Sequence, residues 1–347
     1  MSARLTPVPT VAPPETKEEI VRLLTAEGEA QQALFSSARA VREAAGMQAV
    51  KLRGVIEISN YCQKSCGYCA IRPQNKALER YRMDVDSIVE IASGIRSEGI
   101  RTVFLQAGQD PKCDAIVREA IPRVRALGVN VLLNLGEKSR AAYADYAAAG
   151  ADSYILKFET SDSALYEEIV GTSLAKRLQC IPWIREAGMK VGTGNIIGLP
   201  GQTLDTLAED ILLAKELQPD FVSSSPFIPN ENTPLEEIKP GDLPLTLRSI
   251  AICRLLFPRA LIPAVSALEK IQKGGQLMGL NAGANVMTIN FTPKDFRDKY
   301  AIYSKERFVV SLDHARRTIA RAGLPLLDRR DHEAWRPALA ESRAASG

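Results

Sequence analysis

The chain has 347 residues, of which 46% are hydrophobic and 24% charged, as in globular proteins that bury a core. Its 44 Lys and Arg residues nearly balance its 41 Asp and Glu residues, so the net charge of +3 gives no indication of binding to nucleic acid or to an anionic membrane. No apolar run reaches the ~20 residues that a membrane span requires. The proline-rich start lacks the apolar segment of a secretory signal, which predicts a cytoplasmic protein.

A helical segment is predicted over residues 17–46, after the proline-rich lead-in. From there on, apolar segments of strand character alternate with amphipathic segments of helical period. The predicted strands are residues 55–59, 102–106, 130–135, 153–159, 190–198, 221–228, 261–267 and 285–290. The predicted helices between them are residues 87–98, 115–127, 138–149, 174–187, 203–217 and 245–256.

This alternation predicts an α/β fold, a parallel (β/α)8 TIM barrel with an N-terminal helical extension. Strands such as SYILKFET (153–160) and FVSSSPFIP (221–229) carry polar residues, which suits a barrel lumen. We expect residues 1–50 to form a lead-in and capping helices, residues 51–327 the barrel, and residues 328–347 a polar tail.

Three of the six cysteines, Cys62, Cys66 and Cys69, are spaced C-x3-C-x2-C directly after the first predicted strand. In a (β/α)8 barrel that position lies at the face where active sites are found. Because cytoplasmic thiols are kept reduced, the cluster of cysteines indicates metal binding rather than disulfides. A structural zinc would need a fourth ligand, and the remaining cysteines form no Cys-x-x-Cys pair.

Three thiolates suit a four-iron four-sulfur cluster in which one iron has no protein ligand. The spacing resembles the signature of the radical SAM superfamily. The resemblance implies that the open iron binds S-adenosylmethionine (SAM), and that one electron cleaves SAM to a 5′-deoxyadenosyl radical. It also implies a reducing electron donor such as flavodoxin or ferredoxin.

The resemblance assigns further residues to SAM. Tyr68 would lie beside the adenine, and the LQAGQD stretch, with Gln106 and Gly108, would meet the methionyl amine. Gln109 in this stretch stands where relatives have Glu. The glycine-rich VGTGNIIGLPGQT stretch resembles the family's fifth strand and would contact the nucleoside through Gly192, Gly194 and Ile197.

The fourth predicted strand carries two charged residues on one face, because side chains alternate along a strand. These are Lys157 and Glu159, with Phe158 on the opposite face. By resemblance, Glu159 would bind the ribose or amine of SAM, and Arg177 on the next helix would lie near its carboxylate. An ion pair within the lumen is the alternative for Lys157 and Glu159, and an ordinary solvated charge is the alternative for Arg177.

Longer segments resemble the HydE-type maturase of iron–iron hydrogenase, which is grouped with biotin synthase and methylornithine synthase. They include LRGVIEISNYCQKSCGYCAIRPQNKALERYRM, PFIPNENTPL and GANVMTINFTP. The resemblance implies a small substrate in the lumen, a role in hydrogenase maturation, and other maturases as candidate partners. Asn134, Lys157 and Ser266 are the candidate substrate contacts. No second cluster is expected, since RFVVSLDHARR contains no cysteine.

Alternatives remain open at this point. A methylornithine synthase-like mutase is disfavoured because Ala267 stands where that enzyme carries an acidic residue. A biotin synthase-like enzyme is disfavoured because Cys113, Cys180 and Cys253 fall on predicted helices or their edges, whereas its second cluster is held from strands. A non-catalytic scaffold for an iron–sulfur cluster would need the cysteines but not the SAM-binding glycines or Glu159.

Overall fold

The computed structural model defines residues 10–327, so the first nine residues of the lead-in and the predicted tail at 328–347 lie outside the described residues. Seven parallel strands form one sheet in the order β6-β5-β4-β3-β2-β1-β7. The strands are β1 (Lys51–Ser59), β2 (Thr102–Ala107), β3 (Asn130–Asn134), β4 (Ser153–Ile155), β5 (Lys190–Ile197), β6 (Phe221–Pro226) and β7 (Val286–Asn290).

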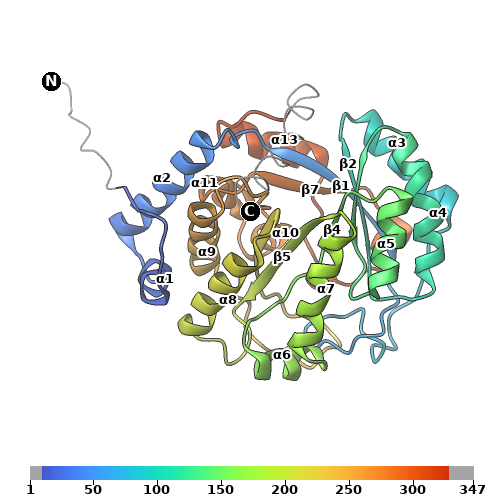
Figure 1. The fold of residues 1–347 in the computed structure, drawn as a ribbon, viewed down its shortest axis with the longest axis horizontal. Coiled ribbons are helices and arrows are strands. Elements are labelled where there is room, and N and C mark those ends of the chain that lie inside the picture. Colours follow the sequence, from blue (N-terminus) through green and yellow to red (C-terminus); the bar gives the residue numbers. More distant parts are fainter. Residues whose placement is uncertain (1–9, 328–347) are drawn as a thin grey trace.

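Helices surround this sheet, as Figure 1 shows. They are α1 (Lys17–Leu24), α2 (Gly28–Ala44), α3 (Val85–Ser97), α4 (Cys113–Ala126), α5 (Arg140–Ala149), α6 (Ser163–Val170), α7 (Leu174–Glu186), α8 (Leu204–Leu217), α9 (Leu243–Leu256), α10 (Ser266–Ile271), α11 (Gly275–Asn281), α12 (Lys294–Arg297) and α13 (Leu312–Arg321). Capping side chains define several helix starts: Asp84, Ser139, Ser173 and Thr203 each accept a backbone N–H of the first turn. The six predicted helices are all present, whereas α6 and the four helices α10 to α13 were not predicted.

A short extended segment closes the sheet between β6 and β7. Leu261 forms a parallel bridge with Phe221, and Pro263 forms one with Val286. The (β/α)8 class is therefore confirmed, with an eighth position made of isolated bridges. The predicted strand over residues 261–267 is wrong in its second half, because the chain turns at Val265 and Ser266 begins α10. Pro263, which has no N–H to donate, shortens the pairing here.

The fourth strand also differs from its prediction. Regular pairing of β4 ends at Ile155, and the next β-bridge to β5 is the isolated one between Glu159 and Asn195. Glu159 has a positive φ of 65°, a conformation that side chains other than glycine rarely adopt. The strand therefore ends in a bent segment at the position where two predicted site residues lie.

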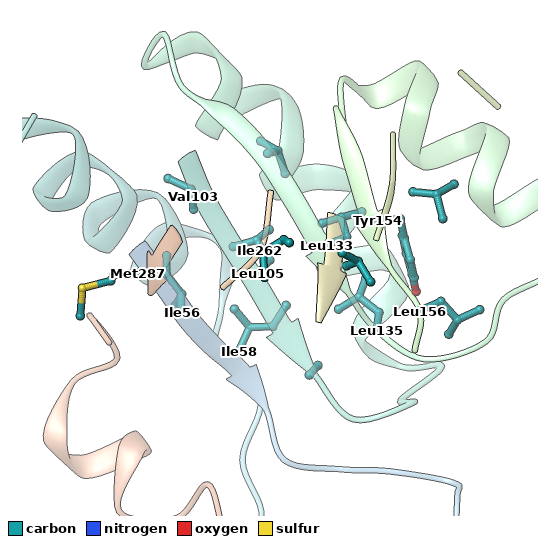
Figure 2. Close-up of a cluster of buried hydrophobic side chains, with 14 of the residues drawn as sticks. Ile56, Ile58, Val103, Leu105, Leu133, Leu135, Tyr154, Leu156, Ile262 and Met287 are labelled. Carbon is teal, nitrogen blue, oxygen red and sulfur yellow. The ribbon is translucent and has the colours of Figure 1, made fainter. Parts of the chain in front are cut away.

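The core has two layers that follow the alternation of side chains along the strands. Outward-facing residues pack against the helices, and Figure 2 shows several of them, including Ile56, Leu105, Leu133 and Tyr154. Inside the barrel, four side chains from successive strands form a separate apolar layer: Val55, Phe104, Leu132 and Ile155. This layer fills the middle of the lumen and leaves the carboxyl ends of the strands for polar residues.

The N-terminal helices lie outside the barrel wall, beside α8 and α9 (Figure 1). Leu24 of α1 and Leu34 of α2 share an apolar cluster with residues of α8 and α9. The sequence predicted helices that cap the barrel; in the structure Met47, which follows α2, contacts Leu261 and Val286 at the amino ends of the strands. Among residues 10–327, none of the helices combines the length and apolar character that a membrane span requires.

Candidate active site

A cavity of about 160 Å³ lies at the carboxyl ends of the strands. It brings together six residues that the sequence singled out for cluster, SAM or substrate: Tyr68, Cys69, Gln106, Asn134, Lys157 and Glu159. The rest of its wall comes from β5, from β6 and the residues after it, and from Ile302 and Tyr303 in the segment that follows α12. The cavity lies at the face of the barrel where active sites are found in this fold.

The cysteine loop, residues 60–83, connects β1 to α3 and contains all three clustered cysteines. The Sγ atom of Cys62 accepts the backbone N–H groups of Lys64 and Gln109, each at 3.3 Å. Gly108 lies against this cysteine, since a Cβ atom there would be 2.7 Å from the Cβ of Cys62 and 2.3 Å from the carbonyl oxygen of Tyr61. The end of β2 is thus built to pack closely against a cysteine sulfur.

The three cysteines have the donor chemistry that an iron–sulfur cluster requires. All three are free thiols, and Cys66 is buried. Burial raises the pKa of Cys66 to about 11 and also raises the pKa of Cys69, so binding of iron must release protons from these thiols. Within residues 10–327 no three Cys, His, Asp or Glu side chains converge closely enough for a single metal ion. A four-iron cluster does not require this, since each thiolate binds a different iron atom.

Lys157 and Glu159 both face the cavity, while Phe158 is buried in the outer layer, as the alternation predicts. The Nζ atom of Lys157 lies 3.1 Å from Oε2 of Glu159. The hydroxyl of Tyr68 donates to Oε1 of Glu159 at 3.3 Å, which joins the cysteine loop to the barrel wall. The structure therefore contains the ion pair that was the alternative prediction, and it places this pair beside Cys69.

Asp210 on α8 supports the bent segment that carries Glu159. This buried carboxylate accepts the backbone N–H of Ser161 at 2.6 Å and the Ser161 hydroxyl at 2.7 Å. Its other oxygen accepts the side-chain amide of Asn195 at 2.9 Å. Burial raises the pKa of Asp210 to about 6, although hydrogen bonds from Asn195 and Ser161 oppose that rise. Asp210 is one site feature that sequence reasoning missed.

Arg177 is buried on α7 rather than solvated. Its Nε donates to the hydroxyl of Tyr166 at 2.7 Å and lies 3.2 Å from Oε1 of Glu137. The other oxygen of Glu137 binds Lys64 of the cysteine loop at 2.7 Å. Glu137 thus links Lys64 of the cysteine loop to Arg177 of α7. We did not predict this network from the sequence. The position of Glu137 in the LNLGEK stretch, just after β3, could have indicated a carboxylate at the active-site face.

The glycines of β5 lie inside the barrel wall. A Cβ atom at Gly192 would be 2.7 Å from the side chain of Ile155, and one at Gly194 would be 1.9 Å from the carbonyl oxygen of Ser223 on β6. Gly192 thus leaves room for the side chain of Ile155, and Gly194 allows the backbone of β6 to approach, a structural role in the described chain. Ile197 does not reach the cavity: it belongs to the outer cluster with Leu24 and Leu34, and its neighbour Ile196 lines the cavity instead.

Ser266 lies in a second cavity of about 120 Å³, deeper in the lumen. Arg53, Glu57 and Thr288 also line this cavity. The two cavities share Gln106, Ile302 and Tyr303, which stand between them. The predicted substrate contacts are therefore divided: Asn134 and Lys157 lie in the cavity beside Cys69, and Ser266 lies in the deeper one.

Comparisons with known proteins agree with this geometry. A family model described as the radical SAM superfamily matches residues 56–214. The [FeFe] hydrogenase maturase subunit HydE of Thermotoga maritima is 39% identical over 88% of this chain and 88% of its own length. The 3-methylornithine synthase of Methanosarcina acetivorans is 32% identical over 80% of each chain. The crystal structure of methylornithine synthase (PylB) gives a TM-score of 0.81 at 28% identity and covers 92% of this chain and 96% of that one. The chain belongs to the radical SAM superfamily.

Proposed function

We propose that this chain is a HydE-like enzyme that acts on a small substrate within the barrel during maturation of iron–iron hydrogenase. The observation that carries the proposal is the cavity in which Cys69, Tyr68, Glu159 and Lys157 meet at the carboxyl ends of the barrel strands. The relative that supports the maturation role is HydE, at 39% identity over 88% of the chain.

In this proposal Cys62, Cys66 and Cys69 hold a four-iron four-sulfur cluster. A cluster bound there would supply the electron for reductive cleavage of SAM. Gly108 and the backbone N–H groups directed at Cys62 keep the end of β2 against the cluster-binding cysteines. Glu159 and Tyr68 face the same cavity and would hold polar groups of SAM beside Cys69.

The remaining polar residues would bind the substrate and exclude water. Lys157 would neutralise an anionic group, and Asn134 would donate or accept a hydrogen bond beside it. Ile302 and Tyr303 separate this position from the deeper cavity that contains Ser266. Confinement of the substrate within the barrel would keep competing hydrogen donors away from a reactive radical.

A methylornithine synthase-like mutase is the second candidate, because PylB shares the fold over 92% of the chain. The side chains around Ser266 favour the maturase. Ala267 is fully buried and carries no carboxylate. The nearby acid, Glu269, accepts the backbone N–H groups of Gly274 and Gln276, so it is engaged at the start of α11.

Genetic complementation tests the proposal. A host that makes iron–iron hydrogenase and lacks only its own HydE-type gene should regain hydrogenase activity with this chain and not with the Cys66→Ala variant. A chain that binds its cluster and cleaves SAM but does not restore hydrogenase activity would contradict the maturation role. Formation of 3-methylornithine by the same protein would then establish the mutase alternative.

A further inference from the structure

The cysteine loop has little regular structure of its own. Between Asn60 and Met83 it forms no helix, and its only pairing with a strand in the described chain is the isolated bridge between Ser59 and Arg82. Such a loop is costly to order, because each residue fixed in one backbone conformation loses about 1–2 kcal/mol of entropy. Contacts from side chains must therefore hold the loop in the shape that directs its cysteines inward.

Arg80 supplies the largest set of such contacts. Its Nη1 donates to the carbonyl oxygens of Asn60 at 2.6 Å and Ile71 at 2.7 Å. Its Nη2 donates to the carbonyl oxygens of Arg72 at 2.6 Å and Asn75 at 3.1 Å. One guanidinium group thus binds four carbonyl groups, one before the first cysteine and three after the last. It joins the two sides of the segment that contains the three cysteines.

The planar fork of arginine suits this task, because its donors point in several fixed directions at once. Asn60 reinforces the arrangement: its Nδ2 donates to the carbonyl oxygen of Glu79 at 2.8 Å, and its Oδ1 accepts the N–H of Tyr81 at 2.8 Å. Among residues 10–327, no carboxylate forms an ion pair with Arg80. The guanidinium therefore forms its hydrogen bonds with the backbone of the loop. Its positive charge lies near Cys62 and Cys69.

We propose that Arg80 is a positioning residue that holds the cysteine loop in its cluster-binding shape before iron and sulfide arrive. The proposal rests on the assignment of the three cysteines as cluster ligands, but not on the identity of the substrate. A preformed loop lowers the entropy lost when the cluster binds, so Arg80 would raise the yield of loaded enzyme.

The test compares wild type, Arg80→Met and Arg80→Lys, with Arg118→Met on α4 as a control, since Arg118 is exposed and its ion pair with Asp145 lies on the surface. Hydrogen exchange of residues 60–83 is measured by mass spectrometry on the cluster-free chains. Iron and sulfide bound per chain are measured after anaerobic reconstitution. We expect exchange in the loop of Arg80→Met to be at least about tenfold faster, with less than half of the wild-type iron, because several charge-assisted hydrogen bonds are lost.

Arg80→Lys keeps the charge but cannot reach four carbonyl groups, so it should fall between wild type and Arg80→Met. Equal exchange in the loop of Arg80→Met and wild type would overturn the proposal, as would Arg80→Lys matching wild type in both exchange and iron content. If Arg80→Met does not fold, the comparison of Arg80→Lys with wild type decides alone. Both readouts are independent of hydrogenase, so a failed complementation experiment leaves this result intact.

Discussion

The ammonium of Lys157 lies 3.1 Å from the carboxylate of Glu159, on the wall of the cavity that contains Cys69. Both side chains are largely buried, with 18% and 13% of their surface exposed. Two residues apart on the same bent segment, they hold opposite charges next to the cysteine loop. This pair allows the proposed roles of SAM binding and substrate binding to be separated by mutation.

Lys157→Met should impair the use of substrate more than the cleavage of SAM. The variant loses a charged hydrogen-bond donor, whose contribution is about 1.5–3 kcal/mol, or about tenfold or more in turnover. We predict at least about a tenfold loss of hydrogenase activity in complementation, with SAM cleavage in the absence of substrate changed less than about threefold. Lys176→Met, at an exposed position of α7, is the control. An equal loss in both assays would contradict the separation of roles.

Cys66→Ala should abolish cluster binding, whereas Cys180→Ala should not. Both cysteines are buried, but the thiol of Cys180 donates to the carbonyl oxygen of Lys176 on its own helix. We predict less than about a tenth of the wild-type iron in Cys66→Ala, and wild-type iron with a loss of about 1 kcal/mol of unfolding free energy in Cys180→Ala. Iron analysis, electron paramagnetic resonance and thermal unfolding measure these effects. Wild-type iron in Cys66→Ala would refute the ligand assignment.

Gly194→Ala should destabilise the barrel itself. The added Cβ would lie 1.9 Å from the carbonyl oxygen of Ser223, so β5 and β6 would have to separate. We predict a loss of more than about 2 kcal/mol in denaturant unfolding. Gly94→Ala on α3, where no atom lies within 4 Å of the new Cβ, should instead gain about 0.5–1 kcal/mol. A stable Gly194→Ala variant would show that β5 tolerates a side chain there. A destabilised barrel would impair an enzyme and a cluster scaffold alike. A substitution at Gly194 therefore does not distinguish these two functions.

Asp210→Asn should change how stability depends on pH. Because burial raises the pKa of Asp210 to about 6, the folded chain keeps a proton that the unfolded chain loses from about pH 4 upward. The carboxylate therefore lowers stability as the pH rises from about 4 to 7, by about 2 kcal/mol. Asparagine cannot titrate, so the unfolding free energy of wild type minus that of the variant should fall over this range. A constant or rising difference in denaturant unfolding would contradict the assigned shift.

Much of the barrel follows from local patterns in the sequence. The helices near residues 87–98 and 203–217 were predicted because apolar residues recur at helical spacing. Lys157 and Glu159 were placed on one face by alternation alone, and the structure confirms that face. The cysteine motif is also local, since its three cysteines lie within eight consecutive residues.

Features that depend on tertiary contacts were not predictable in this way. The eighth strand position is held by bridges from both neighbours, so its length depends on β6 and β7 rather than on its own residues. Ile197 and Ile196 are equally apolar, and only the register of β5 determines which one faces the cavity. The role proposed for Arg80 could not be predicted from the sequence, because its partners are backbone carbonyl groups, which every residue has.

The most direct test of the proposed site is SAM cleavage by the anaerobically reconstituted chain with a strong reductant. The account predicts that the wild type forms 5′-deoxyadenosine and methionine in equal amounts, and that Glu159→Gln loses at least about tenfold in the rate at limiting SAM. Cys66→Ala should form neither product. A wild-type protein that carries a full four-iron cluster and still forms no 5′-deoxyadenosine would contradict the account and favour a cluster scaffold.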